Sequence, residues 1–358
     1  DYLNPWPWPV EDGMCDGWYE GLPYPLLDMR PQGFIGRHFA RRHALDLHLP
    51  DNPDLWNDDE VTYALSVKGH DQPGDLILGE ASYRRLLAAR QAGLSTLEDS
   101  ELAQAYPALA QQALEHGVAG SSAGGEFPKF TASRRHSDGS RFEAIVKFSG
   151  ADGSAAVQRW SDLLVCEHLA LLTVAEALGC EAAQSRIMQL SGRTFLEVRR
   201  FDRHGEFGRS GVCTLASLNA ALLGLGPGAW PRVARALQAR RWLQDEDVSR
   251  IERIWWFGKW IANNDMHEGN LAFRPGLQLA PVYDMLPMGY APLRGGELPP
   301  RRYQPELPLP EETEAWRQAG QAAVIYWQRC AEEPRISTDF RRICAGNAGI
   351  ARQTLESL

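Results

Sequence analysis

The sequence predicts a two-lobed α+β fold, in which strands and a few helices precede a mainly helical second half. This prediction rests on two sequence patterns and on the chain length. Apolar and polar residues alternate over residues 142–148, as in a half-buried strand, whereas apolar residues recur at helical spacing beyond residue 245. The chain has 358 residues, enough for two lobes that each bury a core. Such a fold leaves a cleft between its lobes.

The first 130 residues combine turn signals with one helical pattern. Residues 1 to about 60 are dense in Pro, Trp, Gly and Asp, which predicts turns and an irregular, aromatic-rich surface. Leu and Ala recur at helical spacing from Tyr83 to His116. The small residues and glycines of the segment VAGSSAGGEFPKF, which follows, predict a loop.

Two strands and a long helix are predicted next. The apolar side chains of residues 142–148 share one face of a strand, so Lys147 lies on the other face. An apolar stripe predicts a helix over residues 160–178, and Gly179 is a suitable C-terminal cap. The segment TFLEVRRF, residues 194–201, predicts a second strand.

The second half of the chain is predicted to be mainly helical. Residues 248–261 carry an amphipathic face behind the acidic residues 245–247, which favour the N-terminus of a helix. Helical patterns return from Glu311 to the end, after the proline-rich residues 297–310.

Composition favours a globular, soluble and cytoplasmic protein. Apolar residues make up 44% of the chain, and 46 acidic against 37 basic side chains give a formal charge of −9, which is no footprint for nucleic acid. The six cysteines are scattered, as free thiols in a reducing compartment are. No apolar stretch is long enough to span a bilayer, so no membrane association is expected. Because the chain begins at Asp1 without an initiator Met, a fragment of something longer is one interpretation.

The segment NNDMHEGN, residues 263–270, followed by Asp284 in PVYDM, is the sharpest functional signal. An Asp, an Asn five residues later and another Asp after an apolar stretch form an arrangement that phosphoryl transfer uses. Asp265 would accept a hydrogen bond from the attacking hydroxyl, and Asn270 and Asp284 would supply hard oxygen ligands to Mg²⁺ on the nucleotide phosphates. The spacing therefore predicts a kinase that uses ATP and Mg²⁺.

Structural explanations of the same residues stay open. Asp265 and Asn270 suit caps of the loop after the preceding helix, Asp284 suits a turn, and His267 suits a histidine that stabilises the loop. A zinc site is less well supported, because no second His lies at helix spacing.

Two segments upstream are candidates for phosphate binding. Lys147 would reach the α- and β-phosphates from its strand, and the structural alternative is a lysine on a solvated face. Ser122, Ala123, Gly124 and Gly125 lie in a segment able to present N–H groups to phosphates, although it matches neither GxGxxG nor GxxxxGKS.

The order of these segments resembles the HipA-like serine/threonine kinase toxins. That family has an SxxGxQPK loop, which Ser122, Gly125, Pro128 and Lys129 match here, before a strand ending in a lysine, as in IVKF. LEVRRFDR is similar to its adenine-pocket segment VERFDR, NNDMHEGNLAF to its TDxHxKN catalytic loop, and LAPVYDM to its metal-binding segment. LPYPLLDMRPQG and HDQPGDLILGE are similar to its accessory lobe. GSSAGGE and EHLAL are most similar to the HipH (YjjJ) branch, whose members carry a DNA-binding winged helix before this region.

The resemblance implies a protein-kinase-like fold of the HipA type, with a mixed α/β N-terminal lobe. Its parts would be an accessory subdomain over residues 1–118, an N-lobe core over 119–203 and a helical C-lobe over 204–358. It also implies a protein substrate, an antitoxin partner, and contact with DNA only through a module that is not in these residues.

The resemblance further implies site roles. Lys147 and the loop of residues 122–125 would hold the nucleotide phosphates, and His267 would lie beside the nucleotide. Arg199 and Phe201 would face the adenine. Asp265 would be the catalytic aspartate, with Asn270 and Asp284 as ligands of Mg²⁺. Ser122, or failing that Ser121, would be the site of autophosphorylation.

Three residues depart from the family pattern. Phe127 stands where the family has a Gln, Gly269 where it has a Lys and Arg199 where it has a Glu. The affinity for the nucleotide is therefore an open question. The expected function is an ATP- and Mg²⁺-dependent serine/threonine protein kinase that acts as a toxin. The alternatives are a small-molecule or lipid kinase, and a nucleotide-binding regulator that has lost catalysis.

Overall fold

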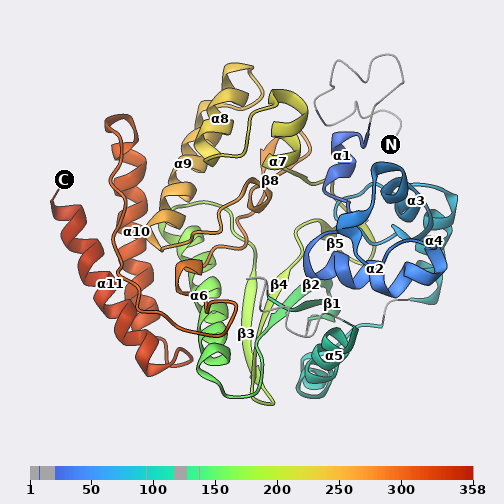
Figure 1. The fold of residues 1–358 in the computed structure, drawn as a ribbon, viewed down its shortest axis with the longest axis horizontal. Coiled ribbons are helices and arrows are strands. Elements are labelled where there is room, and N and C mark those ends of the chain that lie inside the picture. Colours follow the sequence, from blue (N-terminus) through green and yellow to red (C-terminus); the bar gives the residue numbers. More distant parts are fainter. Residues whose placement is uncertain (1–7, 9–20, 94, 117–126, 137, 358) are drawn as a thin grey trace.

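The computed structural model describes residue 8 and residues 21–93, 95–116, 127–136 and 138–357. It is a two-lobed α+β protein, with small helices and a four-stranded sheet in the N-terminal part and a bundle of longer helices in the C-terminal part (Figure 1). The predicted fold class is therefore confirmed.

The N-terminal helices form a small core of their own. They are α1 (Tyr24–Leu27), α2 (Gly33–Leu47), α3 (Asp58–Lys68) and α4 (Glu80–Ala92). Trp56, Val61 and Leu65 are buried between them. The prediction of irregular structure up to about residue 60 is wrong for α2, because Gly33 and Gly36 lie inside this helix, where Gly36 permits a close approach of the Pro31 backbone.

An antiparallel sheet with the order β1-β2-β4-β3 belongs to the N-terminal lobe and lies between the first helices and the C-terminal lobe (Figure 1). Its strands are β1 (Lys129–Arg135), β2 (Arg141–Phe148), β3 (Ser185–Leu190) and β4 (Arg193–Arg199). Helix α5 (Leu102–His116) covers one face, where Phe148 and Phe195 are buried, and α6 (Ala155–Ala177) covers the other, where Ile187 and Leu196 are buried (Figure 1). The single predicted helix from Tyr83 to His116 is in fact α4 and α5.

The C-terminal lobe is mainly helical, as predicted. Its helices are α7 (Leu215–Leu218), α8 (Trp230–Ala239), α9 (Asp245–Trp260), α10 (Thr313–Glu332) and α11 (Thr338–Glu356). Short strands join them, namely β5 (Arg203–His204), β6 (Gly208–Arg209), β7 (Cys213–Thr214), β8 (Ala272–Arg274) and β9 (Gln278–Leu279). Four fully buried tryptophans fill this lobe: Trp230, Trp260, Trp316 and Trp327. The predicted helices 160–178 and 248–261 correspond to α6 and α9.

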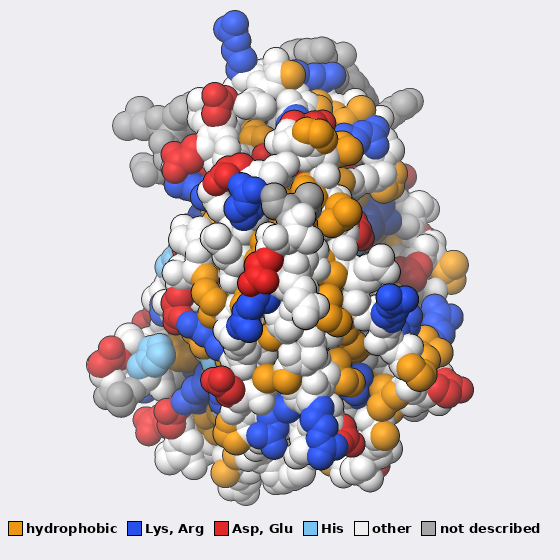
Figure 2. All heavy atoms as spheres, turned by 90° about the vertical axis from the view of Figure 1, so that its left-hand side faces the viewer, with side chains coloured by type: hydrophobic (Ala, Val, Ile, Leu, Met, Phe, Trp, Pro, Cys, Tyr) orange, Lys and Arg blue, Asp and Glu red, His pale blue; other side chains and the backbone are white. Residues whose placement is uncertain are grey.

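The surface formed by the C-terminal helices carries no uniform charge. Side chains of both signs are interspersed with apolar ones on the face that Figure 2 shows. Among the described residues, no helix combines the length and the apolar character that crossing a bilayer requires.

Candidate active site

Lys147 lies inside the protein, on the sheet face that α6 covers. It pairs in register with Lys129 of β1 and Leu196 of β4. Its ammonium donates to both carboxylate oxygens of Glu167 in α6, at 2.7 and 2.8 Å, and to Asp284. Burial acts to lower the pKa of Lys147, but the charges of Asp284 and Glu167 outweigh burial and raise it. The structural alternative of a solvated lysine is therefore wrong, because α6 covers the face on which the alternation places it.

Asp284 is the second anionic partner of Lys147. Its backbone has φ = +52°, a left-handed conformation that Asp and Asn tolerate better than most residues do. Burial acts to raise the pKa of Asp284, but Lys147 and Lys129 lower it below its usual value, so the carboxylate is ionised. A third of its side chain, 33%, remains exposed, and it can therefore meet a ligand in the cleft.

The catalytic-loop candidate begins directly after α9. The N–H of Asp265 donates to Asn263 Oδ1 at 3.1 Å, and Asn270 Nδ2 donates to the carbonyl of Asp265 at 2.9 Å. Asn263 Nδ2 also donates to the carbonyl of Asp284 at 3.4 Å. These bonds fix the Asp265 backbone while its side chain is exposed, and they tie the loop to the segment that carries Asp284. Asn270 thus stabilises the loop, which agrees with the structural explanation of this residue given above.

A buried carboxylate supports the loop from below. Glu268 accepts hydrogen bonds from Asn219 Nδ2 at 2.9 Å and from the N–H of Gly228 at 3.0 Å. Trp230 Nε1 donates to the carbonyl of His267 at 3.0 Å. The loop therefore rests on α8 and on the segment before it, and its exposed side chains are held on a fixed backbone.

The exposed side chains of this loop face a cavity of about 830 Å³. Asp265, His267, Asn270 and Asp284 line it from the C-terminal lobe, and Lys129 lines it from the sheet. Among the described residues, no group of three or more His, Cys, Asp or Glu is arranged to hold a metal. Mg²⁺ is commonly held by one or two carboxylates together with substrate phosphates, so the carboxylate of Asp284 and the amide oxygen of Asn270 fit that donor set.

His267 and Gly269 interact with each other. His267 Nδ1 accepts a hydrogen bond from the N–H of Gly269 at 3.1 Å, and the hydroxyl of Tyr283 donates to the carbonyl of Gly269 at 2.7 Å. A Cβ on Gly269 would lie 2.9 Å from His267 Nδ1, so the departure at this position permits a close approach. His267 both lines the cavity and stabilises the loop.

Neither of the two predicted adenine-facing residues lines this cavity. Arg199 donates to the Gln184 side chain at 3.3 Å and lies over the Phe142 ring, whereas the Phe201 ring lies 5.8 Å from the ring of Tyr283. A second cavity of about 420 Å³, lined by Ile145 and Arg200, shares Asp28, Gln32 and Lys129 with the first. Neither Arg199 nor Phe201 lines it.

The predicted phosphate loop, with Ser121, Ser122, Ala123, Gly124 and Gly125, lies outside the described residues. The described chain resumes at Phe127, whose ring packs edge-on against Trp160 at 4.8 Å. This departure from the family pattern is buried in a contact with α6 and does not line the cavity of the catalytic loop.

Sequence reasoning missed three residues of the site. Glu167 binds Lys147, Glu268 supports the loop, and Lys129 lines the cavity. A glutamate within the helix that follows a lysine strand is a kinase signal, and EHLAL contains Glu167. The loop gives no such signal for Glu268, because its partners come from a different part of the chain.

The fold and the site define a two-lobed, kinase-like α+β protein. Residues 2–87 match the family model of the YjjJ-like toxin middle domain, and residues 121–345 match that of the HipA-like C-terminal domain. The chain is 39% identical over 330 residues to Toxin YjjJ of Escherichia coli (strain K12), which covers 91% of this chain and 73% of that protein. The chain belongs to the family of YjjJ-like and HipA-like toxins, as its motifs predict.

Solved structures also resemble it at low identity. A chain of the Shewanella oneidensis MR-1 toxin–antitoxin complex of HipA, HipB and operator DNA is 12% identical, with a TM-score of 0.49 over 90% of this chain and 84% of that chain. The Helicobacter pylori proinflammatory kinase CtkA is 11% identical, with a TM-score of 0.41 over 63% of this chain and 94% of that chain.

Proposed function

We propose that the protein is an ATP- and Mg²⁺-dependent serine/threonine protein kinase that acts as a toxin. The observation that carries the proposal is the position of Lys147, which binds Glu167 and Asp284 beside the loop that presents Asp265. Protein kinases require a strand lysine paired with a helix glutamate, next to an aspartate that binds metal. Membership of the toxin family supports the same function.

Each residue at the cavity has a part in the proposal. Asp284 and Asn270 would hold Mg²⁺, which neutralises charge on the nucleotide phosphates when it is bound. Lys147 would hold the phosphates and keep its contact with Glu167. Asp265 would accept a hydrogen bond from the hydroxyl of the acceptor, because its side chain is exposed on a loop whose backbone is fixed.

The remaining roles rest on the family resemblance. His267, Arg199 and Phe201 would contact the nucleotide, together with the loop of residues 122–125. Ser122, or failing that Ser121, would receive a phosphate from the kinase itself. An antitoxin partner, a cytoplasmic location and a cellular protein as the acceptor belong to the same proposal.

The test is incubation of the purified chain with Mg²⁺ and ATP labelled at the γ-phosphate, with and without a cytosolic extract. We expect label on proteins of the extract, and mass spectrometry should locate phosphate on residue 121 or 122 of the chain itself. The Asp265→Asn variant should bind nucleotide, because no metal ligand is lost. It should transfer no phosphate, because the carboxylate that accepts the hydrogen bond of the acceptor hydroxyl is gone.

Three results would contradict parts of the proposal. Label in small molecules or lipids only would contradict a protein acceptor, and nucleotide binding without any transfer would indicate a regulator. Comparable transfer by Asp265→Asn would remove the role given to Asp265.

A further inference from the structure

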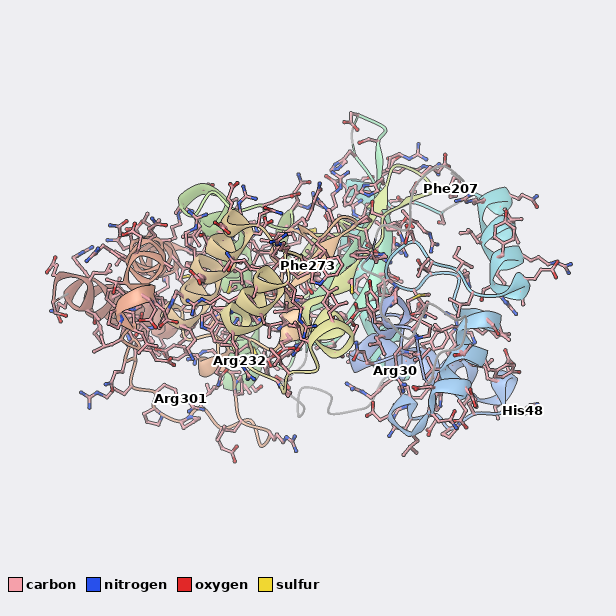
Figure 3. All side chains as sticks on the ribbon, turned by 90° about the horizontal axis from the view of Figure 1, so that it is seen from above. Arg30, His48, Phe207, Arg232, Phe273 and Arg301 are labelled. Carbon is pink, nitrogen blue, oxygen red and sulfur yellow. The ribbon has the colours of Figure 1, made fainter. Side chains whose placement is uncertain are left out.

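A smaller cavity adjoins the catalytic loop on the C-terminal lobe. It has a volume of about 230 Å³, and Asn264, directly before Asp265, lines it. Arg301 and Arg302 of the proline-rich segment also line it. In Figure 3, Arg301 projects outward from the C-terminal lobe. A residue that lines this cavity, Asn264, is thus the chain neighbour of Asp265, the residue proposed to position the acceptor.

The charge of this cavity is not balanced. Three cationic side chains line it, Lys259, Arg301 and Arg302, against one carboxylate, Glu306. Lys259 Nζ lies 2.6 Å from Glu306 Oε1, so that carboxylate already has its partner. Arg301 and Arg302 are exposed and form no ion pair or hydrogen bond with any residue that the structure describes. In a chain of formal charge −9, the lining of this cavity thus carries a local excess of positive charge.

The arginine pair is attached to a rigid part of the lobe. Tyr303, the next residue, is buried, and its hydroxyl donates to the carbonyl of Trp260 at 2.5 Å. Trp327 Nε1 lies 3.3 Å from the same hydroxyl. Since Trp260 is the last residue of α9, this contact fixes the arginine pair relative to the loop that starts three residues later. The backbone of the pair is therefore anchored, and a ligand has to order only the two exposed side chains.

We infer that Arg301 and Arg302 form a docking site for acidic side chains that flank the acceptor residue of a protein substrate. The inference rests on the proposed kinase function and adds a substrate class to it. An extended peptide advances about 3.3 Å per residue, so a carboxylate a few positions from the acceptor can reach this cavity. Guanidinium groups bind carboxylates through paired hydrogen bonds.

Nucleic acid fits this surface less well than an acidic peptide does. A phosphate backbone needs a row of cations along its length, and each released counterion contributes to affinity. The proline-rich segment also carries Glu297 and Glu306, on either side of the arginine pair. One or two carboxylates match two arginines between two glutamates better than a long polyanion does.

The test compares two serine peptides that differ only in having Asp or Asn a few positions from the serine. With the full chain and Mg²⁺-ATP, we expect kcat/KM to favour the Asp peptide by about two- to thirtyfold, as two exposed ion pairs imply. In the double variant R301Q/R302Q the ratio should fall to about one, and raising salt to about 1 M should lower it in the wild type. Arg294→Gln is the matched control, because Arg294 is exposed on a nearby stretch but lines a different cavity.

The outcomes separate this inference from the proposed function. Transfer with an unchanged Asp-to-Asn ratio in R301Q/R302Q would overturn the docking site and leave the kinase in place. If no peptide is phosphorylated, fluorescence anisotropy with the labelled Asp peptide and the Asp265→Asn chain tests the site alone. If the Asp peptide binds more tightly than the Asn peptide, and R301Q/R302Q abolishes this difference, the docking site is supported although the proposed kinase function has failed. Binding of a DNA duplex that depends on both arginines, without peptide binding, would overturn the inference in favour of nucleic acid.

Discussion

Replacement of Lys147 tests whether this residue is both structural and functional. Glu167 is only 1% exposed, and Lys147 is the one described residue that donates hydrogen bonds to its carboxylate. Lys147→Met would therefore leave a buried, unpaired charge. Breaking a buried ion pair in this way costs about 3–5 kcal/mol of unfolding free energy. Asp284 adds less to this cost, because water reaches the exposed third of its side chain.

A second variant distinguishes the ion pair from packing. In Lys147→Met/Glu167→Met both charges are replaced by apolar side chains of similar volume, and we expect stability within about 1 kcal/mol of the wild type. Both variants should be inactive, because neither can hold phosphates. The chain's 12 tryptophans allow urea unfolding to be followed by fluorescence, which gives the free energy of unfolding of each variant and of the wild type.

The pH dependence of the single variant has a definite sign. Burial already raises the pKa of Glu167 in the native protein, against the opposing charge of Lys147, and loss of that charge raises it further. A raised carboxyl pKa means that the folded state is destabilised above this pKa and is relieved of the penalty as the pH falls through it. The stability deficit of Lys147→Met should therefore be larger at about pH 8 than at about pH 5.

The result that would refute this reasoning is a Lys147→Met protein as stable as the wild type at the higher pH. A deficit that grows as the pH falls would also refute it. A double variant less stable than the single one would show that Lys147 and Glu167 are not coupled as the contacts imply.

Two further substitutions test the site. Asp284→Asn keeps a residue that tolerates φ = +52° but removes a charge, so calorimetry should show Mg²⁺-ATP affinity reduced by about tenfold or more, and unchanged affinity would contradict the metal role. Gly258→Ala would place a Cβ 2.2 Å from the Met266 sulfur, so thermal melting should show a loss of about 1–3 kcal/mol together with lower activity. Gly346→Ala, where a Cβ meets nothing within 4 Å, should instead gain about 0.5–1 kcal/mol, and equal effects of the two glycine substitutions would count against the close approach.

The elements that the sequence predicted correctly are those with a strong local pattern. Strand β2 shows regular alternation, and α6 and α9 carry long apolar stripes, so their burial pattern is visible in the residues themselves. Helix α2 was missed because Pro31 lies just before it, Gly33 and Gly36 lie in its first turn, and its buried stripe is sparse. The break between α4 and α5 was missed because the same Leu and Ala spacing continues on both sides of Gly93.

The site was predictable only where its residues share one motif. Asp265 and Asn270 lie in one loop, and Asp284 follows within the same chain segment, so spacing alone suggested a common cavity. The environment of Lys147 could not be predicted, because whether a strand face is solvated depends on which helix packs on it. Glu268 shows the same limit, since Asn219 and Gly228 reach it only in the folded chain.

The charge arrangement around Lys147 bears on how this protein tolerates an ionised carboxylate in its cleft. The Lys147 ammonium compensates Asp284, whose lowered pKa keeps it ionised. Under the proposed function, Asp284 would exchange this cation for Mg²⁺, while Lys147 would turn to the phosphates and keep Glu167 as its counter-ion. Asp284 would then have a cationic partner both before and after binding, namely the singly charged ammonium of Lys147 in the free protein and the doubly charged Mg²⁺, shared with the phosphates, in the complex. Glu167 lies on α6 behind Lys147 and does not line the cavity. Its removal should nevertheless weaken nucleotide binding, because Lys147 would lose its counter-ion.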